Sequence, residues 1–150
     1  MTTTLDLAAA PVLLRAANII TQHGHATGDF NPDSGGYDIP GAIAEASGIS
    51  PDDWDDTAAG RPTLRDYDTA ADHETALAEW KAGRRASLAA LRTLLSHLDG
   101  AARPEDMSRK ELIERISLWN DHDDRTPAEV ITALRTAAEA VTPWPTKPGP

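Results

Sequence analysis

The chain has 150 residues, the usual size of a single domain, and contains no cysteine, which excludes disulfides and thiolate metal sites. Its formal net charge of -10 argues against nucleic-acid binding, because affinity for phosphate backbones comes from an excess of Lys and Arg. No apolar run is long enough to cross a membrane and no signal peptide is recognisable, so we expect a cytoplasmic protein that does not contact membranes.

Two helices are expected in the first third of the chain. Apolar residues recur at helical spacing from Pro11 to His23, and Gly24 then supplies a stop. Further along, Pro40 and Gly48 bracket a second, short helix, because proline is favoured in the first turn of a helix and glycine just past its end.

A loop-rich stretch at residues 24–74, here called the acidic segment, surrounds the second helix. Twelve acidic and only two basic side chains lie between Asp29 and Glu74, so this stretch alone accounts for the whole net charge. Gly, Asp, Asn, Pro and Ser dominate residues 26–39 and favour turns over regular structure. Ser50 is expected to cap one isolated helical turn.

The longest periodic pattern runs from Thr69 to Asp99, where leucines and Trp80 fall on one helical face and Arg84 replaces one apolar residue. Gly83 lies in the middle of this pattern. Glycine in a helix interior costs about 1 kcal/mol relative to alanine, so a bend or a break into two helices is expected there.

The last two helices have the clearest start signals. Ser108 and Glu111 form a capping box, and Thr126 and Glu129 form a second one, with Pro127 at the first helical position. In a capping box the side chains bond backbone amides that the first helical turn leaves unpaired. Because only a short link joins these two amphipathic helices, we expect them to pack as an antiparallel pair.

These elements predict an all-α fold, a small single-domain bundle of four to six helices over residues 1–141. The core is expected to come from the long Leu-rich helix and the two C-terminal ones. Four prolines alternate with polar residues in 142–150, which predicts an extended, solvated tail. A small pair of strands in the acidic segment stays an open alternative.

The residues Trp119-Asn120-Asp121, followed by Arg125-Thr126-Pro127-Ala128-Glu129-Val130-Ile131, resemble the C-terminal signature of an uncharacterised family of small actinobacterial and phage proteins, a domain of unknown function. The stretches Leu13–Ile20 and Gly41–Ile43 are similar to helix starts in that family. Many members have a cysteine shortly before the Gly-Ala step, where this chain has Tyr37–Pro40. Because this chain has no cysteine, thiol chemistry is excluded here. The family that it resembles has no assigned activity, so the resemblance implies none.

The signature also has a structural interpretation. Trp119 would pack under the turn, Asn120 would take the left-handed conformation that ends a helix, and an aspartate would pair with Arg125. The alternative is an oxygen-rich cation site. Its ligands would be Asp121, His122, Asp123 and Asp124. The pattern lacks the glycine and the glutamate of a calcium-binding loop, so we expect no calcium there.

Other combinations of metal-binding or catalytic residue types are sparse. His23 and His25, followed by Asp29, include ligand types that zinc accepts, but histidines around a glycine at a helix end are more often solvated or capping groups. No nucleophile elbow, phosphate-binding glycine loop or zinc-protease motif occurs in the chain. The sequence therefore does not favour an enzyme, and no metal or cofactor is expected.

Two functional hypotheses follow. The first is a small acidic accessory or regulatory protein that binds a basic protein partner through the acidic segment, where complementary charge speeds association and aromatic side chains anchor the interface. The binding residues would be Tyr37, Asp52, Asp53, Trp54, Asp55, Asp56 and Tyr67. The second is a metal-assisted hydrolase or small-ligand-binding protein that uses Asp and His clusters beside a cleft between helices. A third reading, in which the acidic segment is only a solvated loop, is left open.

Overall fold

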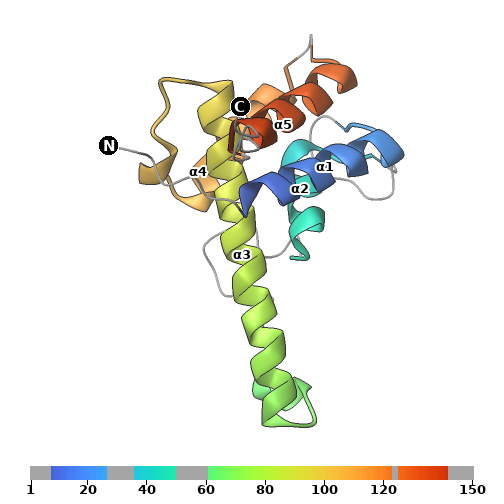
Figure 1. The fold of residues 1–150 in the computed structure, drawn as a ribbon, viewed down its shortest axis with the longest axis vertical. Helices are drawn as coiled ribbons and strands as arrows, with labels where there is room; N and C mark the ends of the chain where they lie inside the picture. The colour runs from blue at the N-terminus through green and yellow to red at the C-terminus, as the bar shows by residue number, and fades with distance from the viewer. Residues whose placement is uncertain (1–7, 27–35, 50–60, 123–124, 142–150) are drawn as a thin grey trace, which may run out of the picture.

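The computed structural model describes residues 8–26, 36–49, 61–122 and 125–141. Within these residues the chain forms α-helices and short 3-10 helices, and no strand (Figure 1). The elements are α1 (Ala9–His23), α2 (Ile39–Ser47), η3 (Leu64–Asp66), α3 (Ala70–Leu98), η4 (Pro104–Asp106), α4 (Arg109–Asn120) and α5 (Pro127–Val141). The predicted all-α fold is confirmed. The extended pairing found in the described part is one parallel bridge between His25 and Tyr37.

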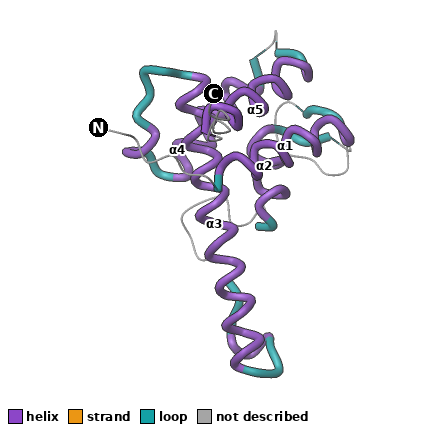
Figure 2. Tube along the Cα trace, in the orientation of Figure 1, coloured by secondary structure: helices purple, strands orange, loops and turns teal. Residues whose placement is uncertain are grey.

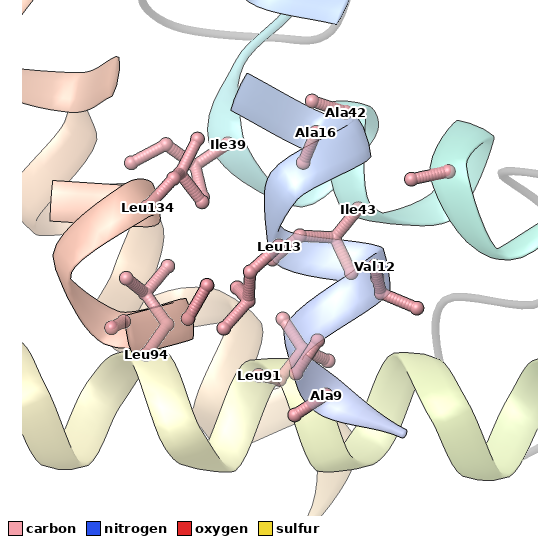
Figure 3. Close-up of a cluster of buried hydrophobic side chains, with 14 of the residues drawn as sticks. Ala9, Val12, Leu13, Ala16, Ile39, Ala42, Ile43, Leu91, Leu94 and Leu134 are labelled. Carbon is pink, nitrogen blue, oxygen red and sulfur yellow. The ribbon is translucent and has the colours of Figure 1, made fainter. Parts of the chain in front are cut away.

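The helix α1 lies at the centre of the core. It packs against α5, α2 and α3, and Figure 3 shows its Leu13 among Ile43, Leu91, Leu94 and Leu134. Burial of one leucine side chain contributes about 1.5–3 kcal/mol. The predicted core of α3, α4 and α5 was therefore incomplete, because the alanine-rich face of α1 lets three helices approach it closely and makes it the common partner.

The helix α2 begins and ends where its sequence predicts. Asp38 caps the N-terminus by accepting a hydrogen bond from the backbone N–H of Gly41 at 2.7 Å, and Pro40 lies in the first turn. Gly48 follows the last turn in the left-handed conformation, with φ of 71°. The isolated turn expected after Ser50 lies outside the described residues.

The helix α3 is continuous over 29 residues, about 44 Å at 1.5 Å per residue, so the predicted break at Gly83 is wrong. Gly83 has a packing role instead. A Cβ atom at this position would lie 2.7 Å from the carbonyl oxygen of Ser47 and 3.0 Å from Cγ2 of Ile49. The C-terminal end of α2 therefore crosses α3 at a distance that leaves no room for a side chain.

The two halves of α3 have different surroundings. The buried residues of this helix all lie between Ser87 and Leu95, whereas no residue from 61 to 86 is buried. In Figure 2 the first turns of α3 extend away from the other helices, and the described segment beside them is 61–69. The end of α2 contacts this half of α3 at Gly83, close to the buried half. We call residues 61–86 the arm, and the other described residues the body.

The helices α4 and α5 do not form the predicted antiparallel pair. The helix α4 packs against α3 and α2, whereas α5 packs against α1 and α3. The apolar face of α4 is buried on α3 and α2, and that of α5 on α1 and α3. The short link between the two helices does not decide their neighbours.

None of the described helices is both long enough and apolar enough to span a membrane. The expected tail at 142–150 lies outside the described residues, and the division of the chain into a domain at 1–141 and a tail stays a prediction.

Candidate functional site

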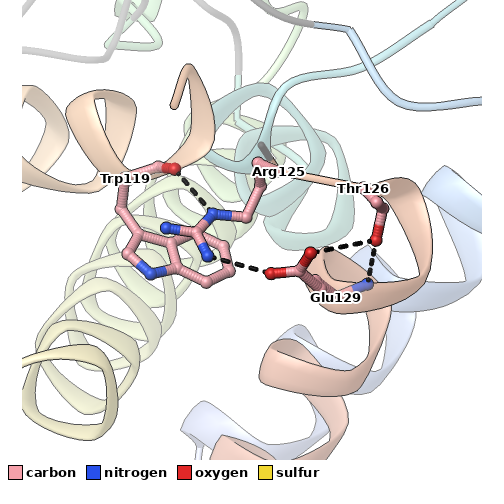
Figure 4. A network of polar contacts seen from close by, with 4 residues as sticks. All are labelled: Trp119, Arg125, Thr126 and Glu129. Atoms are coloured by element: carbon pink, nitrogen blue, oxygen red, sulfur yellow. Dashed lines mark hydrogen bonds and ion pairs between the residues drawn. The ribbon is translucent and has the colours of Figure 1, made fainter. Parts of the chain in front are cut away.

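The C-terminal signature forms a polar network at the junction of α4 and α5 (Figure 4). The guanidinium of Arg125 stacks 3.6 Å from the centroid of the Trp119 ring, and its Nε donates to the Trp119 carbonyl oxygen at 3.0 Å. Through Nη1 the same group donates to the Glu129 carboxylate at 3.0 Å. Arg125 therefore satisfies a terminal carbonyl of α4 while it pairs with the first turn of α5.

Thr126 and Glu129 form the predicted cap of α5. The backbone N–H of Glu129 donates to the Thr126 hydroxyl at 3.2 Å, and that hydroxyl donates to the Glu129 carboxylate at 3.3 Å. The hydrogen bond from Arg125 is the largest cause that holds the pKa of Glu129 below its ordinary value. Helix capping and charge pairing thus explain these signature residues structurally.

Asn120 is fully buried and uses its entire amide group. Its Oδ1 accepts hydrogen bonds from the backbone N–H of Ile39 at 3.0 Å and from Nε2 of His25 at 2.8 Å. Its Nδ2 donates to the carbonyl oxygen of Ala26 at 3.1 Å and to the Asp121 carboxylate at 2.8 Å. Asn120 therefore ties the end of α4 to the start of α2 and to the chain that follows α1.

The left-handed conformation predicted for Asn120 is wrong, because no described residue other than glycine has a positive φ. Asn120 is instead the last residue of α4 and lies on the buried face of this helix. The burial of Asn120 could have been predicted from the sequence. Leu112, Ile116 and Asn120 are spaced four residues apart and so share one side of a helix.

The residues considered for a cation site at the signature have other contacts. Asp121 accepts a hydrogen bond from Asn120, and the ion pair that Arg125 makes within the described residues is with Glu129. No group of three or more Asp, Glu or His side chains among the described residues could hold a metal ion. Two further ligands considered, Asp123 and Asp124, lie outside those residues.

The two histidines near the end of α1 have separate surroundings. The ring of His23 packs against Tyr37, with ring centroids 5.8 Å apart, whereas His25 bonds Asn120. His23 and Tyr37 line a cleft between α1 and α2. Tyr67 lines a different cleft on the arm, so the structure does not bring the two predicted binding tyrosines together.

The arm contains the described C-terminal part of the acidic segment. An open cleft of ≈ 440 Å³ lies between segment 61–69 and the first turns of α3. It is lined by Asp66, Tyr67, Asp68, Asp72, Thr75, Ala76 and Glu79. Its charged lining is entirely acidic, so the cleft is a concave, negatively charged surface with one aromatic ring.

Three contacts hold segment 61–69 against α3. The guanidinium of Arg61 lies 5.9 Å from the centroid of the Trp80 ring. Nε2 of His73 donates to the carbonyl oxygen of Pro62 at 3.2 Å, and the His73 ring packs against Tyr67 at 5.9 Å between centroids. These contacts place the acidic residues of the segment beside those of the helix.

Local hydrogen bonds shape the tip of the arm. The Thr63 hydroxyl donates to the Asp66 carboxylate at 2.6 Å, and this bond is the main cause that holds the pKa of Asp66 below its ordinary value. The Thr69 hydroxyl accepts from the backbone N–H of Asp72 at 3.0 Å and caps α3. Asp66 therefore stays ionised to a lower pH than a free aspartate.

The remaining predicted binding residues lie outside the described residues. They are Asp52, Asp53, Trp54, Asp55 and Asp56. Their part in binding stays a prediction.

The chain matches the model of a protein family. A model described as "Family of unknown function (DUF6197)" matches residues 4–140, which is most of the chain. The chain belongs to this family. The match agrees with the resemblance to an uncharacterised family, and it assigns no specific activity. Comparison with curated proteins and with solved structures gave no match.

This DUF6197 member also has a buried arginine that was not predicted from its sequence. Arg109, at the start of α4, donates through Nη1 to the Ser87 hydroxyl at 2.7 Å and through Nη2 to the Arg84 carbonyl oxygen at 2.7 Å. These bonds attach α4 to α3 where the arm meets the body. Arg109 stands three residues before Leu112, so its position on the buried face was readable from the helical spacing.

Proposed function

We propose that this DUF6197 protein is a small acidic accessory or regulatory protein that binds a basic protein partner through its acidic segment. The observation behind the proposal is the arm, whose helix extends beyond the body and has an open acidic cleft along its side. A helix without buried residues over half its length adds little to the core. The exposed arm is instead well placed to contact another protein.

The charges of the cleft favour a cationic partner. Asp66, Asp68, Asp72 and Glu79 line one open surface of a chain whose net charge is -10. Complementary charge of this kind accelerates and orients association, and it disfavours acidic partners. Lysine or arginine side chains of a partner would therefore enter this cleft.

The arm also has groups that anchor an interface. Tyr67 lines the cleft beside the carboxylates, and tyrosine is among the residues that contribute most to interface energy. Leu64, in the preceding 3-10 helix, is 58% exposed and offers apolar surface at the tip. Charge would then guide the encounter, while Tyr67 and Leu64 would supply burial.

A capture experiment with charge-neutral variants tests this proposal. One bait contains Asp66→Asn, Asp68→Asn, Asp72→Asn and Glu79→Gln. A control bait has the same change in charge on exposed residues of the body, namely Glu105→Gln, Asp106→Asn, Glu114→Gln and Glu139→Gln. We expect the unmodified protein and the control bait to retain the same basic protein from an actinobacterial lysate, as identified by mass spectrometry.

The purified partner is then titrated against each bait by calorimetry at low and high salt. We expect the arm variant to bind at least about tenfold more weakly, and the salt dependence of binding to decrease. Equal affinity of the arm variant and the control bait would disprove the role of the cleft. A third bait with Asp52, Asp53, Asp55 and Asp56 changed to Asn measures the contribution of the other acidic stretch.

We also infer that the protein works in the cytoplasm of an actinobacterium or of a cell infected by its phage. The resemblance of the signature at Trp119-Asn120-Asp121 to proteins of that origin supports this inference, as does a composition typical of a reducing compartment. Immunoblotting of fractionated host cells would locate the protein, and its recovery in the secreted fraction would contradict the inference.

A further inference from the structure

A second cleft lies between α1 and α2, lined by other residues than the acidic cleft of the arm. It has a volume of ≈ 270 Å³. Arg15, Asn18 and Gln22 of α1 line it together with Glu45 of α2 and Tyr37. Positions 15, 18 and 22 are three and four residues apart, so these polar side chains share one face of α1. The volume is near the lower limit of ligand pockets, which fits a small metabolite.

The cleft contains a cationic and an anionic side chain that are not paired with each other. Arg15 donates through Nη1 to the carbonyl oxygen of Ala46 at 3.1 Å, which holds its guanidinium against α2. Within the described residues no ion pair involves Glu45. A guanidinium has five N–H donors, so Arg15 retains donors for a second partner.

We propose that this cleft binds a free α-amino acid with a polar side chain, whose carboxylate pairs with Arg15 and whose ammonium group pairs with Glu45. Glu45 would repel a simple anion and Arg15 a simple cation, whereas a zwitterion satisfies both charges. The guanidinium can hold a carboxylate with two parallel hydrogen bonds. Asn18 and Gln22 offer amide donors and acceptors to the side chain of the ligand. The site does not depend on the proposed function of the arm.

Three related probes test the pairing of charges. L-glutamine has both charged groups, N-acetyl-L-glutamine lacks the ammonium group, and L-glutaminamide lacks the carboxylate. We expect millimolar L-glutamine to shift the amide NMR signals of α1 and α2 in the full chain. Each capped probe should bind at least about tenfold more weakly than L-glutamine, because it loses one charge-assisted hydrogen bond. The proposal is overturned if L-glutamine shifts no signals of these helices, or if N-acetyl-L-glutamine binds equally well.

Variants assign each charge to its partner. Glu45→Gln changes an exposed carboxylate to a nearly isosteric amide, so the fold should be retained. We expect this variant to lose the preference for L-glutamine over N-acetyl-L-glutamine, and Arg15→Gln to lose the preference over L-glutaminamide. Glu139→Gln, on α5 and outside the cleft, is the matched control and should bind all three probes like the unmodified protein. Unchanged preferences in the Glu45→Gln variant would also refute the assignment.

Discussion

The arm and the body contain two halves of one helix, and they show two different reasons for a chain to be helical. Between Ser87 and Leu95 the helix α3 is held by burial against neighbouring helices. Between Ala70 and Ala86 it has no buried residue, and its helicity rests on the Thr69 cap, on good helix-forming residues and on segment 61–69. The body is therefore held together by burial, whereas the arm leaves its surface open, as the proposed contact with a partner requires.

The largest expected loss of stability distinguishes the two halves of α3. Leu94→Ala removes a fully buried side chain of the body and should lower the free energy of unfolding by about 2–5 kcal/mol. Leu77→Ala removes the same atoms from the arm, where the side chain is only partly covered, and should cost less than about 1 kcal/mol. Urea denaturation followed by circular dichroism measures both. Equal losses would show that the arm is as well packed as the body.

A polar contact of the body should have an effect of similar size. Asn120→Ala leaves the N–H of Ile39 and the carbonyl of Ala26 without this buried partner, and should cost about 2–4 kcal/mol. Asn18→Ala changes the same residue type at an exposed position and should cost less than about 0.5 kcal/mol. Urea denaturation again measures the loss in free energy of unfolding. A loss below about 1 kcal/mol for Asn120→Ala would contradict the role of this residue in connecting α4 with α2 and with the chain after α1.

Gly83 lies in the arm, near its border with the body, where the end of α2 contacts α3. In an unobstructed helix Gly→Ala stabilises by about 1 kcal/mol, but here the added Cβ meets the carbonyl of Ser47, and the overpacking should cost about 1–3 kcal/mol. We expect Gly83→Ala to lower the urea midpoint and Gly83→Val to lower it further. A raised midpoint for Gly83→Ala would mean that α2 moves aside without cost.

The smallest effect concerns the exposed pair of Arg125 and Glu129. The native pKa of Glu129 is depressed, so its contribution to stability is present above the ordinary glutamate pKa of about 4.3 and is lost as the pH falls through the lower native value. Glu129→Gln should therefore unfold at a lower temperature than the unmodified protein at pH 7, and the two should converge in strong acid. A difference that does not depend on pH would contradict this linkage.

The candidate sites were predictable to different degrees. The acidic segment was identified from its excess of carboxylates, and Tyr67 was predicted as one of its aromatic anchors. The carboxylates that line the cleft beside Tyr67, namely Asp66, Asp68, Asp72 and Glu79, were not among the predicted binding residues. Tyr37 was grouped with them by proximity in sequence, yet it lines the cleft beside α1. The pairing of a cationic Arg15 with an anionic Glu45 in one cleft was not predicted, since these residues are far apart in the sequence and nothing in the stretch between them indicates that they share a cleft.

Local chemistry in the sequence determined where the helices start and stop. The caps at Asp38, Ser108 and Thr126 join residues three positions apart, so they can be read without knowledge of the fold. The family signature is likewise a run of neighbouring residues, and its capping contacts stay within that run.

Only the tertiary structure decided which helices became neighbours. The bonds of Asn120 reach residues 81 and 94 positions away, and the need for glycine at position 83 comes from a carbonyl of another helix. The same holds for α4 and α5, which separate to pack on α3 and α1. Hydrophobic burial is not directional, so an apolar stripe shows that a helix has a partner but not which one.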